Sequence, residues 1–235
     1  MADMKPLPSL TMFFPCYRDE ATVEPLTRAC LEVGRRLTDD LEVLIVDDGS
    51  PDRAGLIADR LASEHPEVRV IHHGTNRGYG QALLSGWRGA TKEYVFYTDG
   101  DMQFDVGELT RLVDRLPGHD LVVGYRLRRA EGWSRALFSQ AHNLLLLALF
   151  GAHFRDTDCS FKLVHRDLLR RVRFRTTGAL VDAELLLQAR SLGARMTQVG
   201  VRHFARPHGR STCLNPRLVA QTLRDYIDLR IKLSS

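Results

Sequence analysis

Short apolar runs alternate along the chain with longer segments in which apolar residues recur at helical spacing. The short runs predict β-strands at residues 10–14, 41–46, 68–72, 94–97, 121–124 and 196–203. Helical spacing predicts helices at residues 20–37, 51–63, 183–192 and 216–233. Pro51 would lie in the first turn of its helix, where proline is tolerated. Strands separated by helices indicate an α/β fold with a mostly parallel central sheet flanked by helices.

The composition supports a single globular domain. The 235 residues are 44% apolar and 26% charged, which is ordinary for a folded protein. A chain of this length can bury roughly 70–75% of the surface that it exposes when unfolded. No internal repeat, low-complexity tract or linker divides the sequence. We therefore expect one domain over residues 1–235.

Cysteine use and hydropathy predict a cytoplasmic location. The four cysteines lie far apart and form no Cys-x-x-Cys pair, so neither a zinc site nor a disulfide framework is indicated and a reducing compartment fits best. Residues 1–9 lack the apolar core of a secretory signal. The longest apolar run, 144–150, is shorter than the about 20 residues that cross a bilayer.

Arginine is concentrated in two segments of a chain whose net charge is only +4. One segment is residues 126–135, and the other, residues 166–175, holds five arginines. Such patches attract anions. The sequence shows no zinc-finger spacing, aromatic–basic RNA-binding signature or helix-turn-helix pattern. A phosphorylated lipid or an anionic membrane surface is therefore favoured over nucleic acid as a partner.

The most specific chemical signal is Asp99-Gly100-Asp101, which closely follows the predicted strand 94–97. Residues i and i+2 of an extended chain share a face, so a loop leaving the strand can aim both carboxylates at one point. Oxygen ligands favour magnesium, manganese or calcium over zinc, and such ions commonly bridge a protein to substrate phosphates. An isolated Asp-Gly-Asp is more often a turn, but the other loops of this chain favour a cation site.

Polar loops also follow the first three predicted strands, at residues 15–20, 47–50 and 76–80. Each loop alone fits a turn or a helix cap. In a doubly wound sheet, however, ligands collect beyond the carboxyl ends of the strands. Together with Asp99 and Asp101, the loops therefore predict one shared binding site.

These loops, in this order, resemble the family 2 glycosyltransferases of GT-A fold, particularly the branch that includes dolichyl-phosphate mannose synthase and related polyprenyl-phosphate transferases. The resemblance runs through most of the chain. It implies a Rossmann-like GT-A domain with a nucleotide-sugar-binding half at residues 9–103 and an acceptor-binding half at residues 104–235. It also implies that Asp99 and Asp101 hold Mg²⁺ or Mn²⁺, and that Asp101 is catalytic.

The resemblance implies a donor site made from the same loops. Residues near 15–20 would line the nucleoside pocket, Asp47 and Asp48 would meet the base or ribose, and residues 76–80 would shape the sugar side. Gln103 would support the diphosphate or Asp101. The donor-binding residues implied in this way are Pro15, Tyr17, Glu20, Asp47, Asp48, Asn76, Gly78, Asp99 and Gln103.

Sugar transfer from a nucleotide leaves a diphosphate, whose developing charge a divalent cation stabilises as a Lewis acid. The resemblance implies direct displacement with inversion. No Ser/His/Asp nucleophile elbow and no G-x-x-x-x-G-K-[ST] phosphate loop is present, which disfavours hydrolases and kinases. The Gly-rich opening loop of sugar-1-phosphate nucleotidyltransferases is not seen near Phe14.

The acceptor side is predicted downstream of Arg126, which follows a predicted strand. Arg135, Ser139 and Asn143 come next at four-residue intervals, on one face of a predicted helix. The resemblance implies that Arg126, Arg135 and Ser139 bind an acceptor phosphate, whereas the spacing alone also fits a solvated basic face. This helix is predicted at residues 133–151. Its last residues, 144–150, are too apolar for a surface helix, so we expect it either to be buried or to lie in a membrane interface.

Asp156 and Asp158 are the first candidates for a catalytic base, with Asp182 and Glu184 behind them. A base is needed if the acceptor is a hydroxyl, whereas a phosphate acceptor is already ionised near neutral pH. Asp156 also fits a turn and Asp182 a helix cap.

Residues 203–211 are predicted as a mobile polar loop. The resemblance gives His208 and Arg210 in this loop an anion-binding role over the diphosphate and the acceptor. A solvated linker is the alternative interpretation.

Three hypotheses follow from the sequence. The first is a metal-dependent inverting transferase that moves a sugar from a GDP- or UDP-sugar to dolichyl or undecaprenyl phosphate, with peripheral association at the cytoplasmic membrane face. The second keeps the donor but uses a soluble hydroxyl acceptor in glycan or natural-product biosynthesis; it is favoured because the chain ends at Ser235, where many members of this branch continue into transmembrane helices. The third is a non-catalytic nucleotide-sugar binder, which retention of both carboxylates disfavours. The oligomeric state is not predicted.

Overall fold

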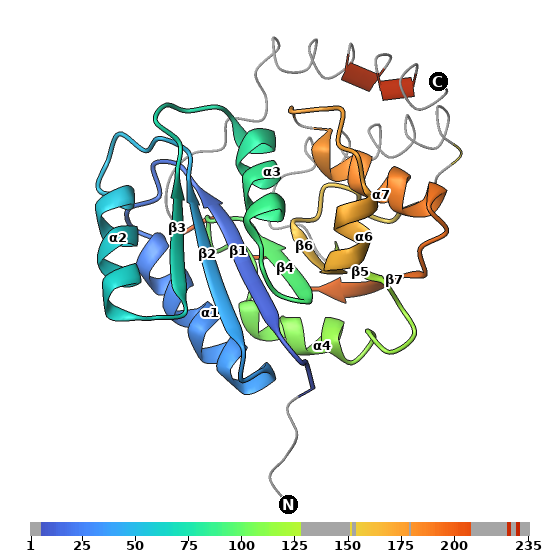
Figure 1. Ribbon diagram of the computed structural model, residues 1–235, viewed down its shortest axis with the longest axis horizontal. Helices are drawn as coiled ribbons and strands as arrows, with labels where there is room; N and C mark the ends of the chain where they lie inside the picture. The colour runs from blue at the N-terminus through green and yellow to red at the C-terminus, as the bar shows by residue number, and fades with distance from the viewer. Residues whose placement is uncertain are drawn as a thin grey trace, which may run out of the picture.

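The protein folds around one central sheet. A computed structural model describes residues 6–127, 151, 154–178, 180–207, 225–226 and 229–230. Within them a seven-stranded sheet has the order β3-β2-β1-β4-β6-β5-β7 (Figure 1). Neighbouring strands are parallel except where β6 pairs antiparallel with β4 and β5. The strands are β1 (Leu10–Cys16), β2 (Leu41–Asp47), β3 (Val68–His72), β4 (Tyr94–Thr98), β5 (Leu121–Arg126), β6 (Phe161–His165) and β7 (Met196–Val201). The predicted α/β fold with a mostly parallel sheet is confirmed.

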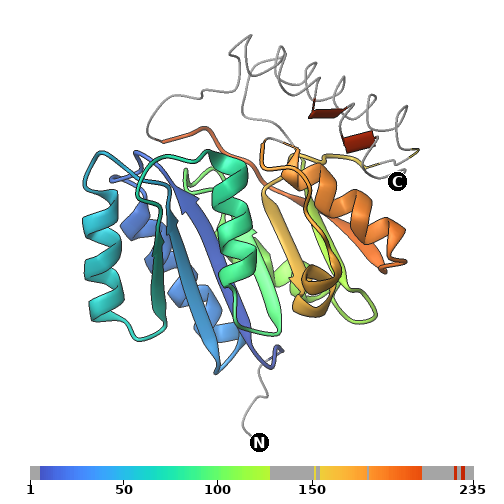
Figure 2. The same ribbon diagram turned by 45° about the horizontal axis from the view of Figure 1, so that its top comes forward.

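Helices cover both faces of the sheet (Figures 1 and 2). One face carries α1 (Val23–Leu37), α2 (Ala54–Glu64) and α4 (Leu109–Val113), and the short 3₁₀ helix η1 (Val106–Glu108) precedes α4. The other face carries α3 (Tyr79–Gly89), α6 (Arg166–Arg171) and α7 (Val181–Ser191). The result is a three-layer α/β/α arrangement.

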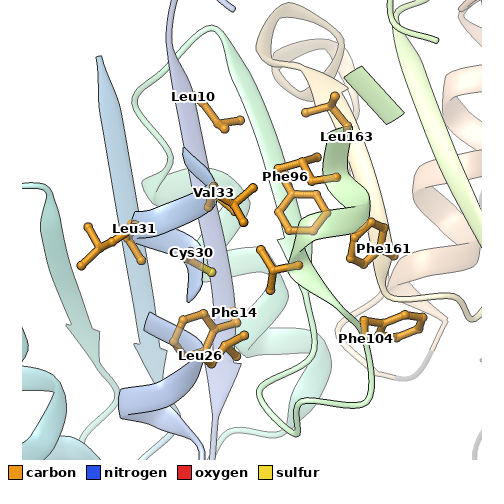
Figure 3. Packing of buried hydrophobic residues seen from close by; sticks show 14 of the residues in the cluster. Leu10, Phe14, Leu26, Cys30, Leu31, Val33, Phe96, Phe104, Phe161 and Leu163 are labelled. Carbon is orange, nitrogen blue, oxygen red and sulfur yellow. The ribbon is translucent and has the colours of Figure 1, made fainter. Parts of the chain in front are cut away.

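The central strands β1 and β2 are buried along their whole length, as expected for parallel strands with helices on both sides. Alternate residues of a strand point to opposite faces. Phe14 therefore packs with Leu26 and Cys30 of α1 (Figure 3), whereas Phe13 packs with Trp87 of α3 on the other face. Each helix layer is thus fixed to the sheet by an apolar cluster of its own.

Some elements differ from the predictions. Helix α2 begins at Ala54, so Pro51 precedes the helix instead of occupying its first turn. Helix α3 was not predicted because it contains three glycines, which weaken the helical signal. One of them is required by packing, since a Cβ on Gly86 would lie 2.2 Å from the Phe13 ring. Strand β6 was not predicted because it is short and Lys162 interrupts its apolar run.

The C-terminal predictions are only partly covered by the described residues. Residues 225–226 and 229–230 are helical, and Tyr226 and Leu229 are buried in the cluster that holds α7. These residues agree with the helix predicted at 216–233. The helix predicted at 133–151 lies outside the described residues, apart from Gly151. Among the helices that the structure describes, none is long and apolar enough to span a bilayer.

Candidate active site

The site forms where the order of the parallel strands reverses. From β1 the chain proceeds outward to β2 and β3 on one side, whereas β4 pairs with β1 on the other. Such a reversal leaves a crevice beyond the carboxyl ends of the two central strands, where ligands bind in doubly wound sheets. The loop after β1 and the loop that carries Asp99 and Asp101 after β4 both open here.

The two loops touch at Gly100. A Cβ on this residue would lie 2.4 Å from the carbonyl oxygen of Pro15, at the end of β1. The glycine between the two carboxylates is therefore required by the close approach of another backbone. The loop then turns sharply at Met102, whose φ is 56°.

Replacing Gly100 tests this contact. We expect Gly100→Ala to lower the free energy of unfolding by about 1–3 kcal/mol, because the methyl group must push two backbone segments apart. Gly74→Ala is the matched control, since a Cβ there would meet no atom within 4 Å. Thermal unfolding of the two variants compares them directly. Equal melting temperatures would contradict the contact between the loops.

Asp99 accepts hydrogen bonds on both carboxylate oxygens. The Tyr79 hydroxyl donates to Oδ1 at 2.9 Å, and the Ser160 hydroxyl donates to Oδ2 at 2.7 Å. Tyr79 begins α3 and Ser160 precedes β6, so two elements distant in sequence fix one carboxylate. The orientation of Asp99 is therefore set by the fold and not by its own loop alone.

Asp101 is buried, at 6% exposure, and is held from both sides. It accepts a hydrogen bond from the backbone N–H of Gln103 at 3.0 Å and an ion pair from Arg206 Nη2 at 2.6 Å. Burial, and then the charge of Asp99, raise the pKa of Asp101 to about 7, although Arg206 opposes this. Two neighbouring carboxylates, of which Asp101 is buried and Asp99 half-buried, are costly to ionise without a cation, and Arg206 supplies one.

The carboxylate oxygens of Asp99 and Asp101 also suit a hard divalent cation. Within the described residues, no group of three or more His, Cys, Asp or Glu side chains is gathered to hold a metal ion. A cation at Asp99 and Asp101 would therefore need further oxygen ligands from water or from substrate phosphates, which is common for Mg²⁺. Two carboxylates at the mouth of the crevice fit this requirement.

Asp47 and Asp48, predicted to meet the nucleoside, support neighbouring loops in the structure. Asp48 accepts hydrogen bonds from the backbone N–H groups of Arg77 and Gly78, both at 2.9 Å, and lies 2.6 Å from His73 Nδ1. Asp47 accepts from the Ser50 N–H at 2.9 Å. These bonds shape the loop that contains Asn76 and Gly78, and nucleoside contact by the two aspartates stays a prediction.

The loop after β1 is joined to the loop after β2. The backbone N–H of Arg53 donates to Glu20 at 3.1 Å, so the Glu20 carboxylate has a partner inside the protein. Tyr17 is 38% exposed at the mouth of the crevice, whereas Pro15 is buried at the end of β1. Their predicted contacts with a nucleoside are not tested by the structure.

Gln103 connects the Asp101 loop to the segment after β7. Its side-chain amide donates to the Phe204 carbonyl at 3.0 Å, and the Phe204 N–H donates to the Gln103 carbonyl at 2.8 Å. This pairing brings Arg206 to Asp101. The sequence indicated an anion-binding role for residues further along this segment, but not that Arg206 would face a carboxylate.

Arg126 and Asp156 form a bidentate ion pair. Arg126 Nε and Nη2 lie 2.6 and 2.7 Å from the carboxylate oxygens of Asp156, and the side chains are only 10% and 4% exposed. Burial would lower the pKa of Arg126, but the hydrogen bonds to Asp156 raise it. The bonds use Nε and Nη2, so a second anion would approach Nη1. Asp156 acts here as a counter-ion, and Asp158 stays a prediction as base.

The other predicted acceptor residues lie outside the described residues. They are Arg135, Ser139, Asn143, His208 and Arg210. Asp182 and Glu184, the reserve candidates for a base, are buried in the first turn of α7. Asp182 is therefore inside the helix and not its cap.

The helical part of the second arginine-rich segment, α6, does not reach the site. This helix follows His165, which pairs with Tyr94 at the amino end of β4, whereas Asp99 follows the carboxyl end. Arg171 instead lines an open cavity of about 800 Å³, together with His119 and Arg195. The arginines of α6 are thus not available to an acceptor phosphate at the carboxylates.

Three residues of the site were not singled out from the sequence. They are Tyr79, Ser160 and Arg206. Tyr79, Ser160 and Arg206 contact aspartates that are 20, 61 and 105 residues away in sequence. No local periodicity reports such contacts.

Comparison with known families agrees with this architecture. The model of the family "Glycosyl transferase family 2" matches residues 11–176, which is more than half of the chain. The chain belongs to glycosyltransferase family 2. The matched region contains strands β2 to β6, all of β1 but its first residue, and both carboxylates, so the resemblance stated from the motifs is confirmed.

Relatives within family 2 include enzymes named for polyprenyl phosphate. Over 228 residues the chain is 30% identical to undecaprenyl-phosphate 4-deoxy-4-formamido-L-arabinose transferase of Pseudomonas aeruginosa, covering 92% of this chain and 64% of the relative. Identity to the enzyme of the same name from Edwardsiella ictaluri is 28%, covering 90% and 65%. Identity to glycosyltransferase AglD of Haloferax volcanii is 29%, covering 82% and 32%. The chain thus spans less than two thirds of the length of these relatives.

Solved structures show the same fold. Glucosyl-3-phosphoglycerate synthase of Mycobacterium tuberculosis, crystallised with Mn²⁺, UDP and glucosyl-3-phosphoglycerate, superposes with a TM-score of 0.74 at 22% identity, covering 95% of this chain and 80% of that one. Its complex with phosphoglyceric acid gives a TM-score of 0.75 at 21% identity, covering 94% and 79%. The predicted GT-A fold is confirmed.

Proposed function

We propose that the protein transfers a sugar from a nucleotide diphosphate sugar to a polyprenyl phosphate, with inversion. The observation that carries the proposal is the pair Asp99 and Asp101 at the reversal of strand order, held by donors from α3, the turn before β6 and the segment after β7. This is where a doubly wound sheet binds nucleotides, and the family assignment supplies the reaction class.

Asp99 and Asp101 would hold Mg²⁺ or Mn²⁺, as their oxygen donors suit a hard cation. When bound, such a cation stabilises the charge of the departing nucleoside diphosphate. Tyr79 and Ser160 orient Asp99, and Arg206 neutralises Asp101 in the metal-free protein. The structural neighbour from Mycobacterium tuberculosis was crystallised with both Mn²⁺ and UDP, which supports the same donor class here.

The polyprenyl phosphate acceptor is supported by the names of the relatives and by Arg126 at the carboxyl end of β5. A phosphate acceptor is already ionised, so it needs a cation to bind it more than a base to activate it. Asp156 is paired with Arg126 and is therefore not placed to act as a base, which fits an acceptor that needs none. We also propose peripheral association with the cytoplasmic membrane face, where such a lipid is available.

A soluble acceptor is the second candidate. It is favoured by the structural neighbour that was crystallised with phosphoglyceric acid, which carries both a hydroxyl and a phosphate. In this case Asp158 would be the first residue to test as a base. A binder without catalysis is the third candidate.

The test uses labelled UDP-, GDP- and dTDP-sugars with Mn²⁺ and two acceptors, undecaprenyl phosphate in detergent and 3-phosphoglycerate. We expect label in the organic phase with undecaprenyl phosphate only. Label confined to a soluble product would establish the second candidate. Donor binding by thermal shift with no transfer or hydrolysis in any mixture would refute the enzymatic proposal.

A further inference from the structure

A lysine is fully buried beneath the candidate site. Lys162 is the second residue of β6, opposite Tyr97 of β4, and its exposed fraction is 0%. Lysine is almost never fully buried unless its ammonium is paired. Nothing in the proposed reaction uses this cation directly, so its burial calls for a separate reason.

The Lys162 ammonium is bound on all sides. Nζ donates to the carbonyl of Cys159 at 2.7 Å and to that of Thr157 at 3.2 Å. It also contacts Asp182 Oδ1 at 2.8 Å and the Tyr97 hydroxyl oxygen at 2.9 Å. Tyr97 in turn donates to Asp182. Lys162 thus joins α7 and β4 to the turn that precedes β6.

That turn leads straight to the carboxylate pair. Ser160 follows Cys159, and its hydroxyl donates to Asp99 at 2.7 Å. The Tyr79 hydroxyl, which donates to the other oxygen of Asp99, lies 3.2 Å from Ser160 Oγ. The Cys159 carbonyl, which accepts from Lys162, belongs to the peptide bond that joins Cys159 to Ser160. The position of Asp99 therefore depends on the position of this turn.

We propose that Lys162 is a positioning residue for the metal site: it fixes the 157–160 turn so that Ser160, together with Tyr79, orients the Asp99 carboxylate toward a bound divalent cation. An apolar residue at position 162, together with an uncharged partner at position 182, could fill the space at little cost in stability. It could not supply directed donors to two carbonyls. This inference rests on the proposed function, because it assumes that Asp99 holds a cation.

The test measures Mn²⁺ affinity by titration of free Mn²⁺, whose electron paramagnetic resonance signal is lost on binding, in the presence of UDP or GDP. We expect Ser160→Ala, Tyr79→Phe and Lys162→Met each to weaken Mn²⁺ binding by about tenfold, a usual effect of removing groups that orient a metal ligand. Lys92→Met and Ser63→Ala serve as controls. Lys92 pairs with Asp40, Ser63 binds the Arg60 carbonyl on the surface, and neither change should alter Mn²⁺ affinity.

A double-mutant cycle separates positioning from general damage. If Lys162 acts through Ser160, Lys162→Met should weaken Mn²⁺ binding little further once Ser160 is alanine, because residues in one network are not additive. Full additivity, or wild-type affinity in Lys162→Met, would overturn the inference. Should Lys162→Met not fold, Lys162→Met/Asp182→Asn removes the unpaired buried carboxylate and is judged by the same cycle. A wild-type protein that binds no Mn²⁺ with either nucleotide would instead refute the proposed function, and the inference with it.

Discussion

Asp101→Asn is expected to reduce sugar transfer by at least ~10³-fold, which corresponds to about 4 kcal/mol of transition-state stabilisation. The substitution keeps the shape of the side chain but removes the negative charge that would hold a divalent cation. The measurement is the rate of label transfer at saturating donor, with and without Mn²⁺. Asp114→Asn, a change at an exposed residue, is the matched control and should transfer at the wild-type rate.

The same substitution should not destabilise the metal-free protein. The pKa of Asp101 is higher in the folded protein, about 7, than its ordinary value of 3.8. Its ionisation therefore lowers the free energy of unfolding as the pH rises between these two values. The amide that replaces the Asp101 carboxylate has no charge to bury, so the melting temperature at pH 7.5 without metal should equal or exceed that of the wild type. If Asp101→Asn kept both its activity and its Mn²⁺ dependence, Asp101 could not be a ligand of the metal ion.

Arg126→Ala is expected to lower the free energy of unfolding by about 3–5 kcal/mol, because it leaves the buried carboxylate of Asp156 without its partner. Transfer to a polyprenyl phosphate should also fall by at least ~10²-fold, or about 2.7 kcal/mol. The single variant therefore mixes two effects, one on folding and one on the acceptor. Chemical denaturation and the transfer assay measure them separately.

The double variant Arg126→Ala/Asp156→Ala separates these effects. Removing both members of a buried pair costs less than removing one, so most of the lost stability should return. If Arg126 binds the acceptor phosphate, activity should stay low in this restored fold. Recovery of activity together with stability would instead mean that Arg126 only supports Asp156, and would favour the soluble acceptor.

The sequence determined the strand layout of the N-terminal half of the fold. Strands β1 and β2 were predicted within two residues of their observed ends, because strands buried on both faces carry near-continuous apolar runs, here residues 12–14 and 43–46. The Asp99 loop was placed correctly for the same reason, since it directly follows such a run. Local hydrophobicity and turn chemistry are properties of neighbouring residues, so the sequence reports them well.

The sequence predicted less where distant segments meet. Strand β6 was missed because Lys162 interrupts its apolar run, and only pairing with Tyr97 and Asp182 explains a buried lysine there. The arginines of residues 166–175 were predicted to attract an anion such as a phosphorylated lipid, but the antiparallel pairing of β6 carries helix α6 to the amino end of β4, opposite the carboxylates. Strand direction is decided by the whole sheet and not by the composition of one segment.

The sequence alone thus determined the fold class, the family and the pair of carboxylates, which all depend on residues close together along the chain. Only the tertiary structure decided what each carboxylate contacts: Tyr79 and Ser160 for Asp99, Arg206 for Asp101, and Arg126 for Asp156. The physical reason is that a hydrogen bond forms where the folded sheet brings two groups within about 3 Å, whatever their separation along the chain.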